Sequence, residues 1–318
     1  MTGDNDKPAR LAADATVADA IEWSAARFDS AGLFFGHGTE NSLDEAAALV
    51  MHIVGANYPV AARVYREVLD AAQRQRLAEI VDERIATRKP AAYLIREAWF
   101  AGLRFYVDER VLVPRSPIAE LISDRFEPWC DSGAVRNILD LCTGSGCIGV
   151  ACAEAFPDAA VDASDVSEDA LAVAAINVER FGLADRVELV RSDIFNELEG
   201  RRYDLIVSNP PYVSRAEMAK LPPEYMCEPG LGLEAGADGL RLVRRILDNA
   251  RTHMTDNGLL VVEVGASQTA LEAAYPRVPF TWVEFEHGGE GVFVMTSSEL
   301  DEFRAEIEAG GQRKENGG

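Results

Sequence analysis

The 318-residue chain has few of the residues that build metal sites and disulfide frameworks. It contains five cysteines and four histidines. No two cysteines form a Cys-x-x-Cys pair, and the histidines do not cluster at metal-ligand spacing. An odd number of unpaired cysteines is typical of small core residues in a reducing compartment. We therefore expect neither a metal site nor a disulfide framework.

Long apolar runs and an excess of positive charge are also missing. No run reaches the roughly 18 residues that a membrane-spanning helix needs, and the first ten residues are polar rather than a signal sequence. We expect a soluble, cytoplasmic protein. The net charge is −22, from 31 Lys and Arg against 53 Asp and Glu. This charge argues against direct sequence-specific binding of nucleic acid. It would attract a basic protein partner, although an acidic surface also simply keeps a protein in solution.

Apolar residues make up 48% of the chain, which is enough to bury a sizeable core. Through residues 15–92 they recur at helical spacing, which predicts a small helical domain after a flexible tail at 1–14. Ser42 and Glu45 have the spacing of a capping box at the start of one of these helices. Another helix is expected over about 71–88.

The pattern changes twice after the helical domain. Residues 93–116 favour strands around the turn-like Asp108-Glu109, which predicts a β-hairpin linker. From 117 to 302, strands and helices alternate, as in a parallel sheet with helices on both faces. Residues 303–318 are expected to be a second flexible tail with nothing to bury.

The expected sheet ends in an antiparallel pair. Its strands fall near 137–141, 160–164, 187–190, 203–208, 258–264, 280–286 and 291–296, with helices near 147–155, 168–180 and 238–251. The last two strands are joined by a loop so short that they must run antiparallel. An alternating unit that ends this way is typical of the methyltransferase variant of the doubly wound fold, not of the dinucleotide-binding one.

A glycine turn at the end of the first of these strands predicts a ligand site. Glycines here let backbone N–H groups approach a ligand at a helix N-terminus. Asp165 stands 165 − 144 = 21 residues beyond Gly144, where an acidic side chain accepts hydrogen bonds from ribose hydroxyls. The alternative is that Asp165 caps the following helix. Gly149 leaves open whether the ligand is a nicotinamide dinucleotide or S-adenosylmethionine. The turn reads Cys142, Thr143, Gly144, Ser145 and Gly146.

The run Asn209-Pro210-Pro211-Tyr212, after the strand at 203–208, indicates methyl transfer. Ligands of open α/β sheets bind at the carboxyl ends of the strands. Two prolines stiffen the loop and leave carbonyl oxygens as acceptors. If Asn209 and Pro210 accept the two N–H groups of a planar amine or amide while Tyr212 stacks on it, the nitrogen lone pair is aimed at a methyl donor. The alternative is a Pro-Pro turn that only ends a strand.

Together these segments resemble the protein glutamine N5-methyltransferases (the HemK/PrmC/PrmB family) over residues 16 to 296. The resemblance implies the α/β fold of class I S-adenosylmethionine-dependent methyltransferases. This fold is Rossmann-like, with a seven-stranded sheet whose last strand is antiparallel. The resemblance also implies that residues 15–92 form a substrate-recognition domain and 117–302 the catalytic domain. The segments that carry it are 111–115, 140–147, 165–167, 192–195, 208–212 and Glu228-Pro229.

The resemblance also implies roles for single residues. Asn209, Pro210 and Tyr212 would be catalytic, and Glu228 would order the loop over the site. Arg115 would bind the substrate backbone or merely pair with an acid. The cofactor S-adenosylmethionine would be held by Asp140, Cys142, Thr143, Gly144, Ser145, Gly146, Asp165, Asp193, Ile194 and Asn209. The substrate would be held by Asn209, Pro210, Pro211, Tyr212, Arg115 and Glu228.

Three segments are similar to the PrmB branch, whose substrate is a glutamine of large-subunit ribosomal protein three. They are Phe34–Thr39, Cys142 and Arg115–Ile118. Release-factor methyltransferases usually have glycine in place of Cys142, and some have tryptophan in place of Ile194. A release factor, an adenine N6 amine of nucleic acid, and a role as a cofactor-binding ribosome-assembly factor remain alternatives. Roles for His37 and His287 stay open.

Overall fold

The computed structural model describes residues 11–56 and 60–312, and the chain divides into two compact units. Unit 1 runs to Glu97 and also takes in Pro222–Cys227. Unit 2 consists of Ala98–Leu221 and the residues from Glu228 onward. The tail predicted at 1–14 lies mostly outside the described residues, but Leu11 packs against the core of unit 1.

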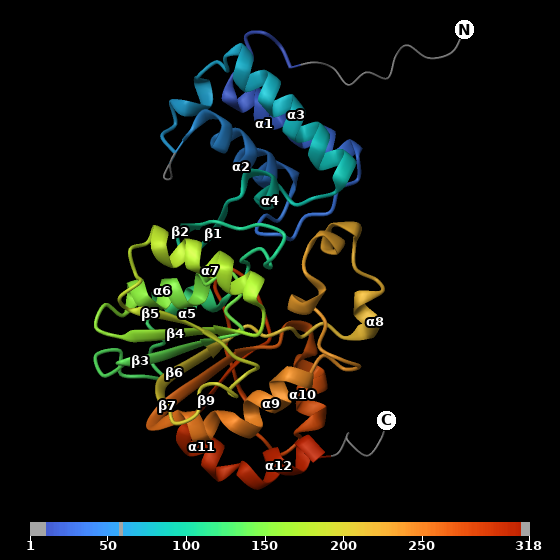
Figure 1. Ribbon diagram of the computed structural model, residues 1–318. Coiled ribbons are helices and arrows are strands. Elements are labelled where there is room, and N and C mark those ends of the chain that lie inside the picture. Colours follow the sequence, from blue (N-terminus) through green and yellow to red (C-terminus); the bar gives the residue numbers. More distant parts are fainter. Residues whose placement is uncertain (1–10, 57–59, 313–318) are drawn as a thin grey trace. The chain divides into compact units, whose positions relative to one another are not determined.

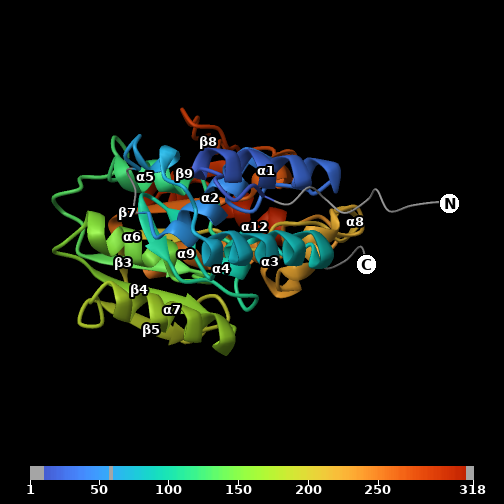
Figure 2. The same ribbon diagram turned by 90° about the horizontal axis from the view of Figure 1, so that it is seen from above.

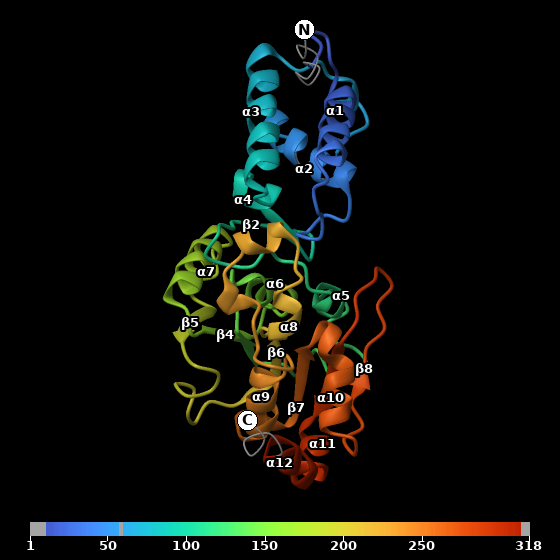
Figure 3. The same cartoon turned by 90° about the vertical axis from the view of Figure 1, so that its right-hand side faces the viewer.

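Unit 1 is helical, as the periodicity predicts. Figures 2 and 3 show α2 lying between α1 and α3. The predicted capping box at Ser42 is wrong, because Asn41 caps α2 by accepting the Asp44 N–H at 2.9 Å while Glu45 is buried inside the unit. The helices are α1 (Val17–Ser30), α2 (Ser42–Val54), α3 (Ala71–Thr87) and α4 (Ala91–Ile95), with a 3-10 turn at Val64–Arg66.

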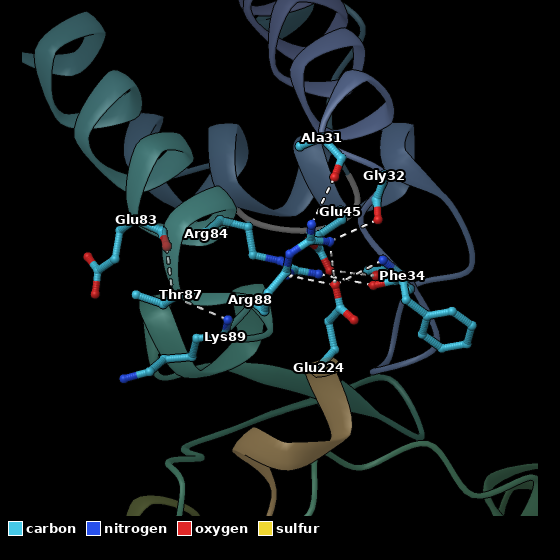
Figure 4. Close-up of polar contacts among 11 residues, drawn as sticks. Ala31, Gly32, Phe34, Glu45, Glu83, Arg84, Thr87, Arg88, Lys89 and Glu224 are labelled. Atoms are coloured by element: carbon cyan, nitrogen blue, oxygen red, sulfur yellow. Dashed lines mark hydrogen bonds and ion pairs between the residues drawn. The ribbon is translucent and has the colours of Figure 1, made fainter. Parts of the chain in front are cut away.

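A buried cluster of charges joins α2 and α3. Arg84 of α3 donates from Nε to Glu45 Oε1 at 2.6 Å, and both side chains are no more than 1% exposed. Its Nη2 donates to the Phe34 carbonyl at 3.1 Å. Burial raises the pKa of Glu45 despite the opposing pull of Arg84. Figure 4 shows these side chains converging from separate helices.

Glu224 brings a distant part of the sequence into this cluster. It belongs to the 3-10 turn Pro223–Cys227, yet its fully buried carboxylate accepts the Phe34 N–H at 3.0 Å and lies 3.3 Å from Arg88 Nη1 (Figure 4). Arg84 Nη1 is 3.8 Å from the same oxygen. The segment that follows the predicted catalytic loop therefore supplies part of the core of unit 1. Nothing in the sequence pattern indicated this insertion.

The β-hairpin belongs to unit 2 and is not a linker. Strands β1 (Ala98–Phe100) and β2 (Leu103–Phe105) pair around Ala101-Gly102, whose φ angles of 48° and 74° suit a two-residue turn. A turn does begin at Asp108, closed by the Val111 N–H donating to the Asp108 carbonyl at 3.1 Å, but it is not the turn that joins the two strands. Phe100 and Phe105 are buried in the core of unit 2.

The sheet of unit 2 has the predicted methyltransferase topology. Within the described residues it has seven strands in the order β5-β4-β3-β6-β7-β9-β8, which Figure 2 shows from one edge to the other. The first five are parallel, and β9 runs antiparallel to both β7 and β8. The predicted fold class is confirmed. The strands are β3 (Asn137–Leu141), β4 (Ala160–Asp165), β5 (Val187–Arg191), β6 (Tyr203–Ser208), β7 (Met254–Glu263), β8 (Thr281–Trp282) and β9 (Val292–Thr296).

Strand β8 is much shorter than the predicted 280–286. The Val283 N–H still reaches the Val292 carbonyl at 2.9 Å. Beyond it, the N–H groups of Glu286 and His287 donate to the carboxylate of Glu120 at 2.9 and 3.1 Å. After Val283 the backbone is therefore held by the Glu120 side chain of α5 instead of by a neighbouring strand.

Helices cover both faces of the sheet, and neighbouring strand residues point to opposite faces. Ile138 lies in the core beneath α5 (Ile118–Ser123), α6 (Cys147–Ala155) and α7 (Glu168–Arg180), whereas Leu139 lies in the core on the other face. Figure 1 shows this second face covered by the remaining long helices. They are α9 (Arg241–Ala250), α10 (Gln268–Ala274), α11 (Ser297–Glu302) and α12 (Arg304–Gln312), while α8 (Arg215–Met218) lies in a loop.

The prediction of a flexible tail over 303–318 is wrong as far as residue 312, because α12 occupies Arg304–Gln312. Ile307 is buried, and Gly310 lies so close to Tyr275 that an added Cβ would stand 2.3 Å from its ring. One buried apolar residue and one close glycine contact are too weak a sequence pattern to predict this helix. No helix in the described part of the chain is long and apolar enough to span a membrane.

Replacing Arg84 by methionine should strongly destabilise unit 1, because Glu45 and Glu224 would lose the cation between them. Removing one partner of a buried ion pair costs about 3–5 kcal/mol. The control is Asp82→Asn, which breaks a pair between Arg27 and a side chain that is 65% exposed. Such a pair contributes at most about 1 kcal/mol. Chemical unfolding measures both variants, and equal losses would contradict this account.

Candidate active site

The carboxyl ends of the parallel strands bring most of the predicted site residues together. Because parallel strands end at the same edge of a sheet, the residues that follow them become neighbours. Asp140 and the glycine turn end β3, and Asp165 ends β4. Asp193 and Ile194 follow β5, and Asn209 follows β6. These residues, predicted from the sequence, therefore lie at the carboxyl edge of the sheet of unit 2.

The glycine turn after β3 has the conformation of a ligand cradle. Cys142, Gly144 and Gly146 have φ angles of 64°, 56° and 79°. A cysteine in this region is sterically strained, and such strain is often found at functional sites. The buried Asn177 of α7 fixes the turn by donating to the Ser145 carbonyl at 2.8 Å.

Asp140 is a fully buried carboxylate with one oxygen to spare. Its Oδ2 accepts hydrogen bonds from the Thr143 hydroxyl and, at 2.8 Å, from the Gly149 N–H. Within the described residues its Oδ1 has no hydrogen-bond partner. Burial raises the pKa of Asp140 to about 7. A Cβ on Gly149 would lie 3.1 Å from Oδ2, so glycine is needed here for close approach to the carboxylate.

Asp165 ties the end of β4 to the glycine turn. Its Oδ2 accepts the Gly144 N–H and its Oδ1 the Ser167 N–H, both at 2.9 Å. The cap of α7 is Ser167, which accepts the Ala170 N–H, so the capping interpretation of Asp165 is wrong. Burial raises the pKa of this carboxyl, against the pull of its backbone donors.

The residues after β5 lie in a second strained turn. Ile194 is buried with a φ of 57°, an unusual value for a β-branched residue. The Ser192 hydroxyl donates to its carbonyl at 2.7 Å. Asp193 is half exposed and pairs with Arg245 of α9 at 2.8 Å, a hydrogen bond that lowers the pKa of Asp193.

The predicted catalytic loop leaves β6 beside the glycine turn. The buried Ser208 donates from Oγ to the Leu141 carbonyl at 2.7 Å, which joins the ends of β6 and β3. Asn209 is half-buried, and the two prolines after it are buried. Tyr212 is half-buried, and its hydroxyl donates to Glu263 Oε1 at 2.9 Å.

Arg115 and Glu228 form a bidentate ion pair. The two guanidinium nitrogens donate to the two carboxylate oxygens at 2.6 and 2.8 Å, and the Glu228 side chain is fully buried. Glu228 also accepts the Val113 N–H at 3.1 Å. Of the two roles considered for Arg115, the geometry shows the pairing with an acid. The pair holds the segment that follows Tyr212 at Glu228.

Backbone hydrogen bonds join the two ends of that segment. Val213 donates to the Leu233 carbonyl and accepts from the Ala235 N–H, both at 2.9 Å. Residues 213–235 thus form a loop whose two ends are paired at the start of α8. Both contacts lie directly beside Tyr212.

The two histidines left open by the sequence belong to different units. His37 is buried in unit 1, with its ring 4.4 Å from that of Tyr225. The His287 side chain is 85% exposed and lies 3.9 Å from Glu120.

Known proteins identify the family. A family model described as Methyltransferase small domain matches residues 124–228. A relative from Francisella tularensis subsp. tularensis is 46% identical over 290 residues, 91% of this chain and 92% of the relative. Another, from Neisseria gonorrhoeae, is 47% identical over 286 residues, 90% and 95% of the two chains. Both are named ribosomal protein uL3 glutamine methyltransferase. The chain belongs to this family.

Among solved structures, a methyltransferase from Pyrococcus furiosus is 19% identical, with a TM-score of 0.44. It covers 70% of this chain and 98% of its own.

Membership of the family makes the chain a methyltransferase and implies S-adenosylmethionine as the methyl donor. The residues at the carboxyl edge fit that ligand. The spare oxygen of the buried Asp140 suits a cationic ammonium group. The left-handed turn through Gly144 and Gly146 lets the backbone approach a ligand closely.

Several residues that build this methyltransferase site were missed. Glu263 and Ser116 meet at the carboxyl end of β7, and Asn177 supports the glycine turn. Glu263 carried a usable signal, since it is the charged residue that ends the apolar run Leu259–Val262, as Asp165 ends its own strand. Asn177 carried none, because a polar residue within a helix is usually exposed.

Replacing Glu228 by glutamine should loosen the loop at 213–235 in this methyltransferase. The change removes a bidentate charge-assisted pair, and a hydrogen bond to a charged group contributes about 1.5–3 kcal/mol. Hydrogen exchange of the Val213 and Ala235 amides should therefore accelerate roughly tenfold or more. Exchange within β3 should not change. The control is Glu188→Gln, in an exposed pair with Arg201, and a similar acceleration there would refute the role of Glu228.

Proposed function

We propose that this methyltransferase transfers a methyl group from S-adenosylmethionine to the side-chain amide nitrogen of a glutamine in ribosomal protein uL3. Relatives with that printed name are 46–47% identical over about nine-tenths of the chain, which supports the substrate. The observation that carries the proposal is the Asn209–Tyr212 loop at the carboxyl end of β6, beside the glycine turn. We further propose that the protein acts in the cytoplasm.

The cofactor would be held along the ends of β3, β4 and β5. The Asp140 carboxylate would pair with the ammonium of the methionine part, and Asp165 would accept from the ribose hydroxyls. Asp193 and Ile194 would border the adenine, with the left-handed turn at Ile194 shaping that side. The remaining contacts would come from Cys142, Thr143, Gly144, Ser145, Gly146 and Asn209.

The catalytic loop would orient the target amide. S-adenosylmethionine supplies an electrophilic methyl group when bound. Asn209 Oδ1 and the Pro210 carbonyl would accept the two amide N–H groups, while Pro211 keeps the loop stiff and Tyr212 stacks on the amide plane. This arrangement turns a delocalised nitrogen lone pair toward the methyl carbon.

The same acceptors would stabilise the transition state. As the nitrogen gains positive charge, its N–H groups become better donors, so hydrogen bonds to Asn209 and Pro210 strengthen during the reaction. The cationic N-methylated amide that results would be strongly acidic, and its extra proton could pass to water. No strong base is needed before the transfer.

Unit 1 and the charge of the chain support a protein substrate. A primary amide is present on every exposed glutamine and asparagine, so the Asn209 loop cannot select one protein. We propose that residues 15–92 read the substrate surface, and that Arg115 and Glu228 shape its entry through their ion pair. The net charge of −22 favours a basic ribosomal protein over nucleic acid.

The direct test is mass spectrometry of unmethylated uL3 incubated with the protein and S-adenosylmethionine. The wild-type chain should add one methyl group, 14 Da, to a single glutamine. Asn209→Ala should lower the rate by roughly a hundredfold while changing cofactor affinity less. Peptide-chain release factors serve as the competing substrate. Methylation of a release factor but not of uL3 would refute the proposed substrate.

Cofactor affinity should depend on pH through Asp140. Its carboxyl becomes neutral below a pKa of about 7 and then loses its attraction for an ammonium group. Calorimetry between about pH 5.5 and 7.5 should show affinity falling with pH by up to roughly tenfold per unit. Asp140→Asn should bind weakly with a flat profile. A flat profile in the wild-type protein would remove Asp140 from the ammonium site.

A further inference from the structure

Glu263 is a buried carboxylate at the end of β7 whose two oxygens are both occupied. Oε2 accepts the Ser116 hydroxyl at 2.5 Å, and Oε1 accepts the Tyr212 hydroxyl at 2.9 Å. The residue is 4% exposed. Burial raises the pKa of Glu263, while the two hydroxyl donors and the charge of Arg115 favour its ionised form. It is therefore committed to holding hydroxyl groups, and one of them belongs to the catalytic loop.

Ser116 fixes the carboxylate from the opposite side. Its Oγ donates to Glu263 and also accepts the Ile118 N–H at 3.2 Å, at the start of α5. Ser116 directly follows Arg115, which pairs with Glu228. The dipeptide Arg115-Ser116 thus positions two buried carboxylates. Glu228 lies on the loop after Tyr212, and Glu263 accepts the Tyr212 hydroxyl.

Tyr212 is held at its other end as well. Its carbonyl accepts the Ser267 hydroxyl at 2.8 Å. A Cβ on Gly265 would stand 2.6 Å from the tyrosine ring, and a Cβ on Gly239 would stand 2.2 Å from its carbonyl oxygen. Both glycines have positive φ angles, 45° and 77°. The two glycines therefore let the backbone lie directly against the ring and the carbonyl of Tyr212, and Glu263 holds the end of that ring.

We propose that Glu263 is a positioning residue for methyl transfer, which fixes the plane of the Tyr212 ring through its hydroxyl so that the ring can stack on the substrate amide. The inference rests on the proposed function of the Asn209–Tyr212 loop. A tyrosine bonded at both its carbonyl and its hydroxyl cannot rotate about Cα–Cβ without losing a hydrogen bond. A hydrogen bond to a buried carboxylate is among the stronger ones. The tyrosine hydroxyl thus serves orientation and takes no part in proton transfer.

The test compares Tyr212→Phe, Glu263→Met and Glu263→Gln with the wild-type protein. Phenylalanine keeps the ring but loses its anchor, and methionine removes the acceptor. Each should lower kcat about 10- to 100-fold, with cofactor affinity and the uL3 KM within about threefold. Glutamine retains an acceptor oxygen and should recover part of the loss. Because Glu263→Met already removes the acceptor of the Tyr212 hydroxyl, Tyr212→Phe should cost nothing further in the Glu263→Met background.

The matched control is Tyr275→Phe. Tyr275 is a buried tyrosine of the same unit, and its hydroxyl has no hydrogen-bond partner within the described residues. This variant should keep the wild-type kcat. Losses that add in the double variant, or a wild-type kcat in Tyr212→Phe, would overturn the role of Glu263.

Failure of the proposed function would appear differently. If the wild-type chain does not methylate uL3, the substrate proposal fails. The contact between Tyr212 and Glu263 is then tested by urea unfolding of the same four variants and the double variant. Non-additive stabilities of Tyr212→Phe and Glu263→Met would keep the anchoring contact. Additive stabilities would overturn it.

Discussion

Parallel pairing of β4, β3, β6 and β7 is the constraint on which the whole site depends. Four residues or turns that are far apart in sequence become neighbours because their strands end at the same edge. They are Asp165, the turn Cys142–Gly146, Asn209 and Glu263. The antiparallel β9 lies against β7, and β8 beyond it completes the sheet; neither supplies a residue that the proposed mechanism uses.

Two buried carboxylates, Asp140 and Glu263, and the partly buried Asp165 stand at this edge, and their hydrogen bonds separate their roles. A buried carboxylate must be compensated, or it becomes protonated. Glu263 has both oxygens engaged by hydroxyl groups, and Asp165 has both engaged by backbone N–H groups. Asp140 alone keeps an oxygen without a partner among the described residues. Glu263 therefore suits the positioning of other side chains, and Asp140 suits contact with a cation. Asp165 accepts one N–H at each oxygen and keeps lone pairs that suit the ribose hydroxyls.

The sequence predicted the sheet, the glycine turn and the catalytic loop, because each depends on local patterns: apolar runs, glycines and consecutive prolines. It did not predict the role of Glu45, because the helix is capped one residue earlier than predicted, by Asn41, which leaves Glu45 to turn inward to Arg84. Glu224 was also out of reach, since 224 − 84 = 140 residues separate it from Arg84. The hairpin was predicted around the wrong turn, because Asp108 does begin a turn, but the two strands pair around Ala101-Gly102.

The account predicts one arrangement above all, that of a glutamine amide in the Asn209–Tyr212 loop. A crystal structure of the protein with S-adenosylhomocysteine and a glutamine-containing peptide of uL3 tests it most directly. The amide nitrogen should donate to Asn209 Oδ1 and to the Pro210 carbonyl, with the Tyr212 ring stacked on the amide and its hydroxyl still bonded to Glu263. A glutamine bound elsewhere, or an Asn209 side chain turned away from the amide, would contradict the account.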